Sequence, residues 1–225
     1  MFLNSSKWYN ILIISLKIFF TFSCNSPITN DDCNIGTLDC CNENLINFLN
    51  VNNTICNSNS TLHNINCYIQ VIEDMYKNGK EKDLLKICNA YTNYKNCLGN
   101  SFPKCLSKNY LNNFLNNQKI VFNISNFIRK LTFVCGSGLE SFLINDECIS
   151  NVFEKQKNSL EKCWIDFEES FEQLTVCANL NVYIQCYTNI FFNSCNSESA
   201  WWSCEYGKAS LFSNYPQCST QCTFS

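Results

Sequence analysis

The chain of 225 residues carries 18 cysteines, a formal net charge of −3 at pH 7 and a single arginine, Arg129. Arginine is the main side chain that binds guanines and phosphates through paired hydrogen bonds, and nucleic acid repels an acidic chain. The composition therefore argues against nucleic-acid binding. Cysteine near the roughly 8–10 % threshold for short secreted chains indicates a disulfide scaffold, which forms in an oxidising compartment.

Residues 1–23 have the layout of a secretory signal peptide. Lys7 lies in a short polar start, an apolar run interrupted by Lys17 covers residues 11–22, and Ser23 places a small residue before the cut. The apolar run is shorter than the roughly 20 residues that a membrane-spanning helix needs. We therefore expect a soluble mature protein that is secreted, extracellular and without a membrane anchor.

Three asparagines begin Asn-x-Ser/Thr sequons without an intervening proline: Asn52, Asn59 and Asn123. A eukaryotic secretory pathway attaches N-linked glycans at such sequons when they are accessible. Asn52 and Asn59 flank Cys56 in a polar stretch that indicates a surface loop. Asn123 lies near the predicted start of a helix, where an exposed glycan is less favoured.

Helical periodicity dominates the rest of the chain, with few prolines and glycines to interrupt it. Apolar residues at three- and four-residue steps indicate one buried face of an amphipathic helix. Glycines at 79 and 99 follow the first two such stretches and predict their ends. We therefore expect an all-α fold. The three stretches are Leu62, Ile65, Ile69, Ile72 and Tyr76; Leu84, Ile87, Tyr91, Tyr94 and Leu98; and Trp164, Phe167, Phe171 and Leu174.

Cysteine spacing suggests an internal duplication. The series Cys88, Cys97 and Cys105 resembles the series Cys177, Cys186 and Cys195, and upstream we match Cys67 with Cys163. We therefore predict two similar helical, cysteine-rich halves, at residues 24–144 and 145–225, which either stand apart or form one continuous domain. A chance match in a cysteine-dense chain is the alternative.

All eighteen cysteines are expected to form disulfides, and the spacing limits their pairing. Cysteines nine residues apart on one continuous helix point in opposite directions, so they need partners on other helices. The spacing leaves the connectivity open. The cysteines are Cys24, Cys33, Cys40, Cys41, Cys56, Cys67, Cys88, Cys97, Cys105, Cys135, Cys148, Cys163, Cys177, Cys186, Cys195, Cys204, Cys218 and Cys222.

A family resemblance rests on the segments 88–98 and 127–143, followed by Cys148 and Cys163. Across roughly residues 33 to 204, their cysteines and scattered aromatics resemble the nematode secreted cysteine-rich family of the chondroitin proteoglycan 4 domain type. Related nematode secreted domains of unknown function share this style. The resemblance implies an extracellular role in egg or matrix material, and it carries over no catalytic residue.

Ser137 is a candidate for glycosaminoglycan attachment because it precedes Gly138, and such chains begin on Ser-Gly. The dipeptide lies close after Cys135 and before an apolar run. A glycine-rich turn between two helices is therefore the favoured interpretation, with the glycines supplying unusual backbone angles.

The residues expected of an enzyme are scarce. His63 is the only histidine, so a histidine-rich metal site cannot be built, and a surface or capping role is favoured for it. An even cysteine count argues against a free catalytic thiol, and an oxidising compartment pairs cysteines that could otherwise hold zinc. We expect no catalytic residue, no metal and no cofactor.

Two non-enzymatic classes remain. The favoured one is an extracellular structural or protein-interaction module of matrix, eggshell or a host interface. In this module Trp201 and Trp202 offer an aromatic contact to an unknown partner, unless they cover a disulfide. The alternative is a carrier of a lipid or small hydrophobic ligand, whose phenylalanines line a cavity between helices instead of filling the core. These candidates are Phe114, Phe122, Phe127, Phe133, Phe191 and Phe192.

Overall fold

Helices account for every regular element in the described part of the chain, which confirms the predicted all-α class. The computed structural model describes residues 33–51, 56, 65–77, 81–170, 176–211 and 214–222. The predicted signal peptide, Cys24, Asn52, Asn59 and His63 lie outside these residues. The elements are α2 (Ile35–Leu49), α3 (Ile65–Lys77), α4 (Glu81–Leu98), a 3-10 turn η2 (Gly99–Ser101), α5 (Phe102–Cys105), α6 (Lys108–Asn112), α7 (Gln118–Val134), α8 (Leu139–Ile144), α9 (Asp146–Lys155), α10 (Lys157–Glu169), α11 (Val176–Ser194) and α12 (Ser197–Leu211).

The predicted apolar faces of α3 and α4 are buried. Ile65, Ile72 and Tyr76 are buried on α3, as are all five predicted residues of α4. Helix α4 ends as predicted, because Gly99 takes a φ of 52°, a left-handed conformation that favours glycine. On α10 the predicted face is buried at Phe167, and positions 171 and 174 lie outside the described residues.

Asparagine and serine side chains begin several of the helices. The Asn34 side chain accepts a hydrogen bond from the Gly36 amide at 2.8 Å, and the Ser107 hydroxyl accepts one from the Tyr110 amide at 3.2 Å. Asn117 accepts two bonds from amides in the first turn of α7. Each cap satisfies backbone donors that the helix leaves unpaired. Part of the asparagine-rich composition is therefore used to start helices.

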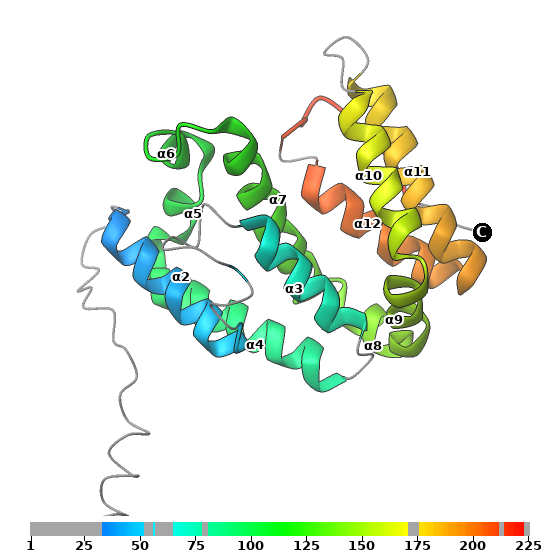
Figure 1. Cartoon of the computed structure of the whole chain (residues 1–225), viewed down its shortest axis with the longest axis horizontal. Helices are drawn as coiled ribbons and strands as arrows, with labels where there is room; N and C mark the ends of the chain where they lie inside the picture. Colours follow the sequence, from blue (N-terminus) through cyan, green and yellow to red (C-terminus); the bar gives the residue numbers. More distant parts are fainter. Residues whose placement is uncertain are drawn as a thin grey trace, which may run out of the picture.

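The helices form two sides that meet along α7 and α12 (Figure 1). Helices α2, α4, α5 and α6 lie on one side, and α10 and α11 lie on the other. Helix α12 packs against both α7 and α11, while α3 packs against α7 and α9. The buried apolar side chains form one continuous cluster through both sides.

Eight disulfides staple the helices, and none of the eight joins a residue before 145 to a residue after it. Cys40 is disulfide-bonded as well, and no described cysteine is free. None of the eight links cysteines nine residues apart on one helix, as predicted. The pairs are Cys33–Cys105, Cys41–Cys97, Cys56–Cys67, Cys88–Cys135, Cys148–Cys195, Cys163–Cys186, Cys177–Cys218 and Cys204–Cys222.

Three disulfides of each half follow the same order along the chain. With Cys40, Cys56–Cys67 and Cys204–Cys222 set aside, the first cysteine pairs with the fifth, the second with the fourth and the third with the sixth, in both halves. This shared order supports the predicted equivalence of the series beginning at Cys88 and Cys177. The six are Cys33, Cys41, Cys88, Cys97, Cys105 and Cys135 in one half and Cys148, Cys163, Cys177, Cys186, Cys195 and Cys218 in the other.

The predicted match of Cys67 with Cys163 is wrong. Cys67 bonds to Cys56, only 11 residues away, whereas Cys163 bonds to Cys186 across two helices. In the shared order Cys163 corresponds to Cys41. The error arose because an additional helix, α3, lies between the second and third cysteines of the first half and carries its own cysteine.

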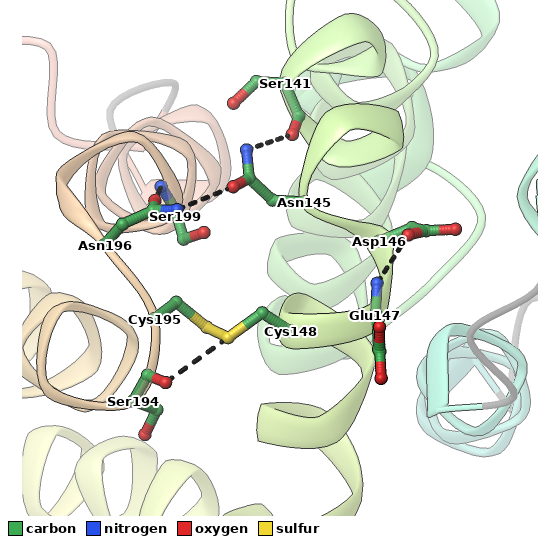
Figure 2. Close-up of a disulfide and its surroundings, with 9 residues drawn as sticks. All are labelled: Ser141, Asn145, Asp146, Glu147, Cys148, Ser194, Cys195, Asn196 and Ser199. Carbon is green, nitrogen blue, oxygen red and sulfur yellow. Dashed lines mark hydrogen bonds between the residues drawn. A yellow bond between two sulfur atoms is a disulfide. The ribbon is translucent and has the colours of Figure 1, made fainter.

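A polar network marks the joint between the halves (Figure 2). The Asn145 side chain donates to the Ser141 carbonyl at 3.0 Å and accepts from the Asn196 side chain at 2.8 Å. The Asn196 side chain also accepts from the Ser199 amide at the start of α12. Beside this network, Cys148 bonds to Cys195. The joint between α8 and α9 is thus fastened to the turn between α11 and α12.

Trp202 lies in the core where the two halves meet. Its side chain is fully buried, and its indole nitrogen donates to the Gly138 carbonyl at 2.9 Å. Ring centroids lie 5.3 Å from Phe142 in the first half and 5.0 Å from Tyr206 in the second. Offset and edge-on ring pairs add to the free energy of burial. Trp202 therefore joins the halves without a covalent bond.

The expectation that Trp202 offers an exposed contact is wrong. Adjacent aromatics on a helix point about 100° apart, and on α12 the core takes Trp202 and leaves Trp201 partly buried against Phe133. A partner could reach only the exposed part of Trp201. That role stays a prediction.

Disulfides confined to each half predict that a cut between the halves separates them. A site-specific protease sequence inserted after Ile144, which is 64 % exposed, should yield a nicked protein that stays associated in native buffer. In denaturant without reductant it should separate into two fragments by mass spectrometry. Fragments that remain linked until reductant is added would show a disulfide between the halves.

Trp202→Phe should lower the free energy of unfolding by about 2–4 kcal/mol, because it leaves a gap and a buried carbonyl without its donor. Trp201→Phe is the matched control, and its cost should stay near the roughly 1 kcal/mol typical of point substitutions. Urea denaturation followed by circular dichroism measures both. Equal costs for the two variants would contradict this role of Trp202.

Candidate functional site

A cleft of about 340 Å³ separates the two halves. Helices α3 and α7 form one wall, α10 forms the other, and residues of α9, α11 and α12 close the back. Figure 1 shows α3 and α7 on one side of the molecule and α10 on the other. The lining residues are Asn66, Ile69, Gln70, Glu73, Asp74, Lys77, Lys119, Asn123, Asn126, Phe127, Lys130, Phe153, Lys157, Leu160, Glu161, Trp164, Ile165, Glu168, Tyr183, Tyr187 and Ser210.

Each wall helix presents a regular stripe of residues to the cleft. On α7 the stripe is Lys119, Asn123, Asn126 and Lys130, on α3 it is Asn66, Gln70, Glu73 and Lys77, and on α10 it is Lys157, Glu161, Trp164 and Glu168. The spacing is i, i+4, i+7 and i+11 in every case. Such positions lie on one face of an α-helix. Three helices therefore turn a mostly polar face toward the same space.

The back of the cleft is aromatic and apolar. Phe127, Phe153 and Leu160 are buried there. The ring of Trp164 lies edge-on to that of Tyr183, with 5.6 Å between centroids. An apolar back with polar walls is the usual composition of a small-molecule site, and the volume lies at the lower end of the roughly 300–1,000 Å³ range of such sites.

Two ion pairs cross the cleft between the halves. Lys119 at the start of α7 lies 3.0 Å from Glu168 near the end of α10, and Lys157 at the start of α10 lies 3.9 Å from Asp74 on α3. All four side chains are more than a third exposed. Exposed pairs contribute roughly 0–1 kcal/mol each. These two pairs therefore span the cleft but add little to the stability of the contact between the halves.

The inner part of the cleft holds a more buried ion pair. The Lys130 ammonium lies 3.6 Å from the Glu73 carboxylate, and the two side chains are 17 % and 34 % exposed. The same ammonium lies 4.6 Å from the centre of the Tyr206 ring. A cation over a ring face is attracted by the ring quadrupole. Lys130 is thus held by a carboxylate and a ring together.

Tyrosines beside this pair stay protonated far into the alkaline range. Burial raises the pKa of Tyr183, Tyr187 and Tyr206, and the negative charge of Glu73 raises each pKa further. Tyr183 and Tyr187 line the cleft. At neutral pH both therefore carry phenolic hydroxyls that can donate or accept a hydrogen bond.

Asn123 lies in the cleft wall instead of on an open surface. Its side chain is 8 % exposed, and its amide nitrogen donates to the Asn66 side-chain oxygen at 2.7 Å. An N-linked glycan is carried by that same nitrogen, so a glycan would replace one of its two hydrogens and would have to enter the cleft. Glycosylation at Asn52 and Asn59 stays a prediction outside the described residues.

Of the six phenylalanines predicted to line a cavity, Phe127 does so. The others lie in the aromatic core (Phe133 and Phe191), against the ring of Tyr215 (Phe122), or largely exposed (Phe114 and Phe192). The cavity predicted from the phenylalanines did not include the charged residues of the cleft walls. The signal that could have revealed them was the polar stripe on each of three helices.

Ser137 lies in the turn between α7 and α8, as expected. Its neighbour Gly138 has an ordinary φ of −90°, so the predicted need for unusual backbone angles is wrong. A side chain there would instead lie 2.6 Å from the Phe133 ring. Gly138 is therefore required by close packing. Ser137 itself is exposed, and glycosaminoglycan attachment there stays a prediction.

Two further properties of the described residues concern metals and membranes. They contain no group of three or more histidine, cysteine, aspartate or glutamate side chains arranged to hold a metal ion. No helix among them combines the length and hydrophobicity that crossing a bilayer requires.

The buried tyrosines predict a steep loss of stability above pH 10. An unfolded tyrosine ionises near pH 10, whereas the buried ones keep their protons to higher pH. Their contribution is therefore full below pH 10 and falls by about 1.4 kcal/mol per tyrosine for each pH unit above it. Absorbance at 295 nm should show the buried tyrosines ionising together with loss of helical circular dichroism. Ionisation of every tyrosine near pH 10 with intact helices would contradict this.

Comparison with known proteins adds no relative. No protein-family model, curated protein or solved structure matches the chain. The resemblance to the chondroitin proteoglycan 4 domain type stays a prediction from cysteine spacing. What the molecule does must therefore be inferred from its own cleft.

Proposed function

We propose that this protein is an extracellular, non-enzymatic binding protein that holds a small amphiphilic ligand in the cleft between its halves. The cleft is the observation that carries this proposal, because it combines an aromatic back with polar walls. The eight disulfides support the extracellular location, since such bonds persist in oxidising compartments.

The cleft favours the carrier over the structural or protein-interaction module that the sequence alone favours. Of the two aromatic contacts predicted for such a module, Trp202 is buried and Trp201 is partly buried. The volume of about 340 Å³ suits a compact ring system or one short chain. A two-chain phospholipid is too large for it. The disulfides stiffen the half on each side of the cleft, which lowers part of the cost of ordering the walls on binding.

A blocking substitution tests the proposal. Ile69 lies in the cleft wall and is partly buried, so Ile69→Trp should fill the space. Val182→Trp is the matched control, because Val182 is 64 % exposed on α11 and does not line the cleft.

The probe is N-phenyl-1-naphthylamine, an uncharged molecule whose fluorescence rises in an apolar site. We expect saturable binding to the secreted protein and to Val182→Trp, and binding at least about tenfold weaker (about 1.4 kcal/mol) for Ile69→Trp. Melting temperatures confirm that both variants fold. No binding by the unmodified protein, or equal binding by both variants, would contradict the proposal.

A further inference from the structure

We infer that the cleft selects uncharged ligands, each with a compact apolar body and one neutral hydrogen-bonding group such as an alcohol or an amide. This inference rests on the proposed function and names the ligand class of that site. The arrangement of the charged side chains in the cleft supports it.

The charged side chains of the cleft balance one another. Four lysines and four carboxylates line it, and every one of the eight takes part in an ion pair with another of the eight. The pairs are Lys77–Asp74, Lys119–Glu168, Lys130–Glu73, Lys157–Asp74 and Lys157–Glu161. A charged ligand would therefore find no unpaired counter-charge and would have to share a charged group with its present partner or displace that partner.

Displacement is most costly at the inner end, beside the aromatic back. An anion that approaches Lys130 must compete with Glu73 at 3.6 Å, and a cation that approaches Glu73 must compete with Lys130. Burying an ion without a partner is far more costly than burying a neutral polar group. The inner pair therefore disfavours both signs of charge.

Neutral groups in the same walls remain able to bind a ligand. Asn123 donates one hydrogen bond to Asn66, but each amide carries a carbonyl oxygen and two N–H donors, so one bond does not exhaust the pair. Tyr183 and Tyr187, which line the cleft, also carry phenolic hydroxyls. An alcohol or amide can both donate and accept, and it can pair with such groups without disturbing an ion pair.

Three ligands that share one apolar body test the inference: 2-naphthylmethanol, 2-naphthoate and 2-naphthylmethylammonium. Each is titrated at pH 7 as a competitor of N-phenyl-1-naphthylamine bound to the secreted protein. We expect the alcohol to displace the probe at a concentration at least about tenfold lower than either ion. Equal or tighter binding of an ion, or no displacement by the alcohol, would overturn the inference while leaving probe binding intact. No probe binding at all would instead overturn the proposed function.

Breaking the inner pair should reverse the selectivity. Glu73→Gln leaves Lys130 without its carboxylate, so 2-naphthoate should bind at least about fivefold tighter. Lys130→Gln should favour 2-naphthylmethylammonium in the same way. Lys162→Gln is the matched control, because Lys162 pairs with Asp166 on α10 and does not line the cleft. Unchanged selectivity in both cleft variants, with melting temperatures showing that they fold, would overturn the inference.

Discussion

The packing around Trp202 holds the two halves of the molecule together at the centre of their contact. The described disulfides staple each half internally, so the angle between the halves depends on side chains buried where they meet. The indole contacts rings from both halves and donates to the Gly138 carbonyl. Because the cleft lies between the halves, its width depends on the same contacts. The cleft therefore lies between two halves that are each held by disulfides, and non-covalent contacts set its width.

The cleft also shows how a small disulfide-rich protein can keep polar helix faces at a partly buried site. Exposed ion pairs bracket it at Lys119 and Lys157, and the less exposed pair of Lys130 and Glu73 lies inside. Pairing removes the cost that a lone buried charge would impose. The cost of leaving a partly buried charge unpaired explains these ion pairs better than the attraction within each pair does, since exposed pairs contribute little stability.

Features that depend on one helix could be predicted, and features that depend on two could not. The face of α4 and its end at Gly99 follow from local spacing and from one backbone angle. Burial of Trp202 in place of Trp201 depends on the direction from which α7 and α8 approach α12. The cleft joins α3, α7 and α10, which are distant in the chain, so its polar stripes acquire meaning only when the helices meet. The predicted match of Cys67 with Cys163 was wrong for a related reason. Helix α3 adds a cysteine, Cys67, to the first half and so shifts the order of the cysteines.

Helix α3 ties the cleft to a difference between the two halves. In the order of disulfides shared by the halves, α3 has no counterpart in the second half, where Cys163 and Cys177 follow each other closely. Yet α3 supplies much of one cleft wall, including Glu73 and Asp74. In a protein whose halves otherwise share their order of disulfides, the cleft therefore depends on the one helix by which the halves differ.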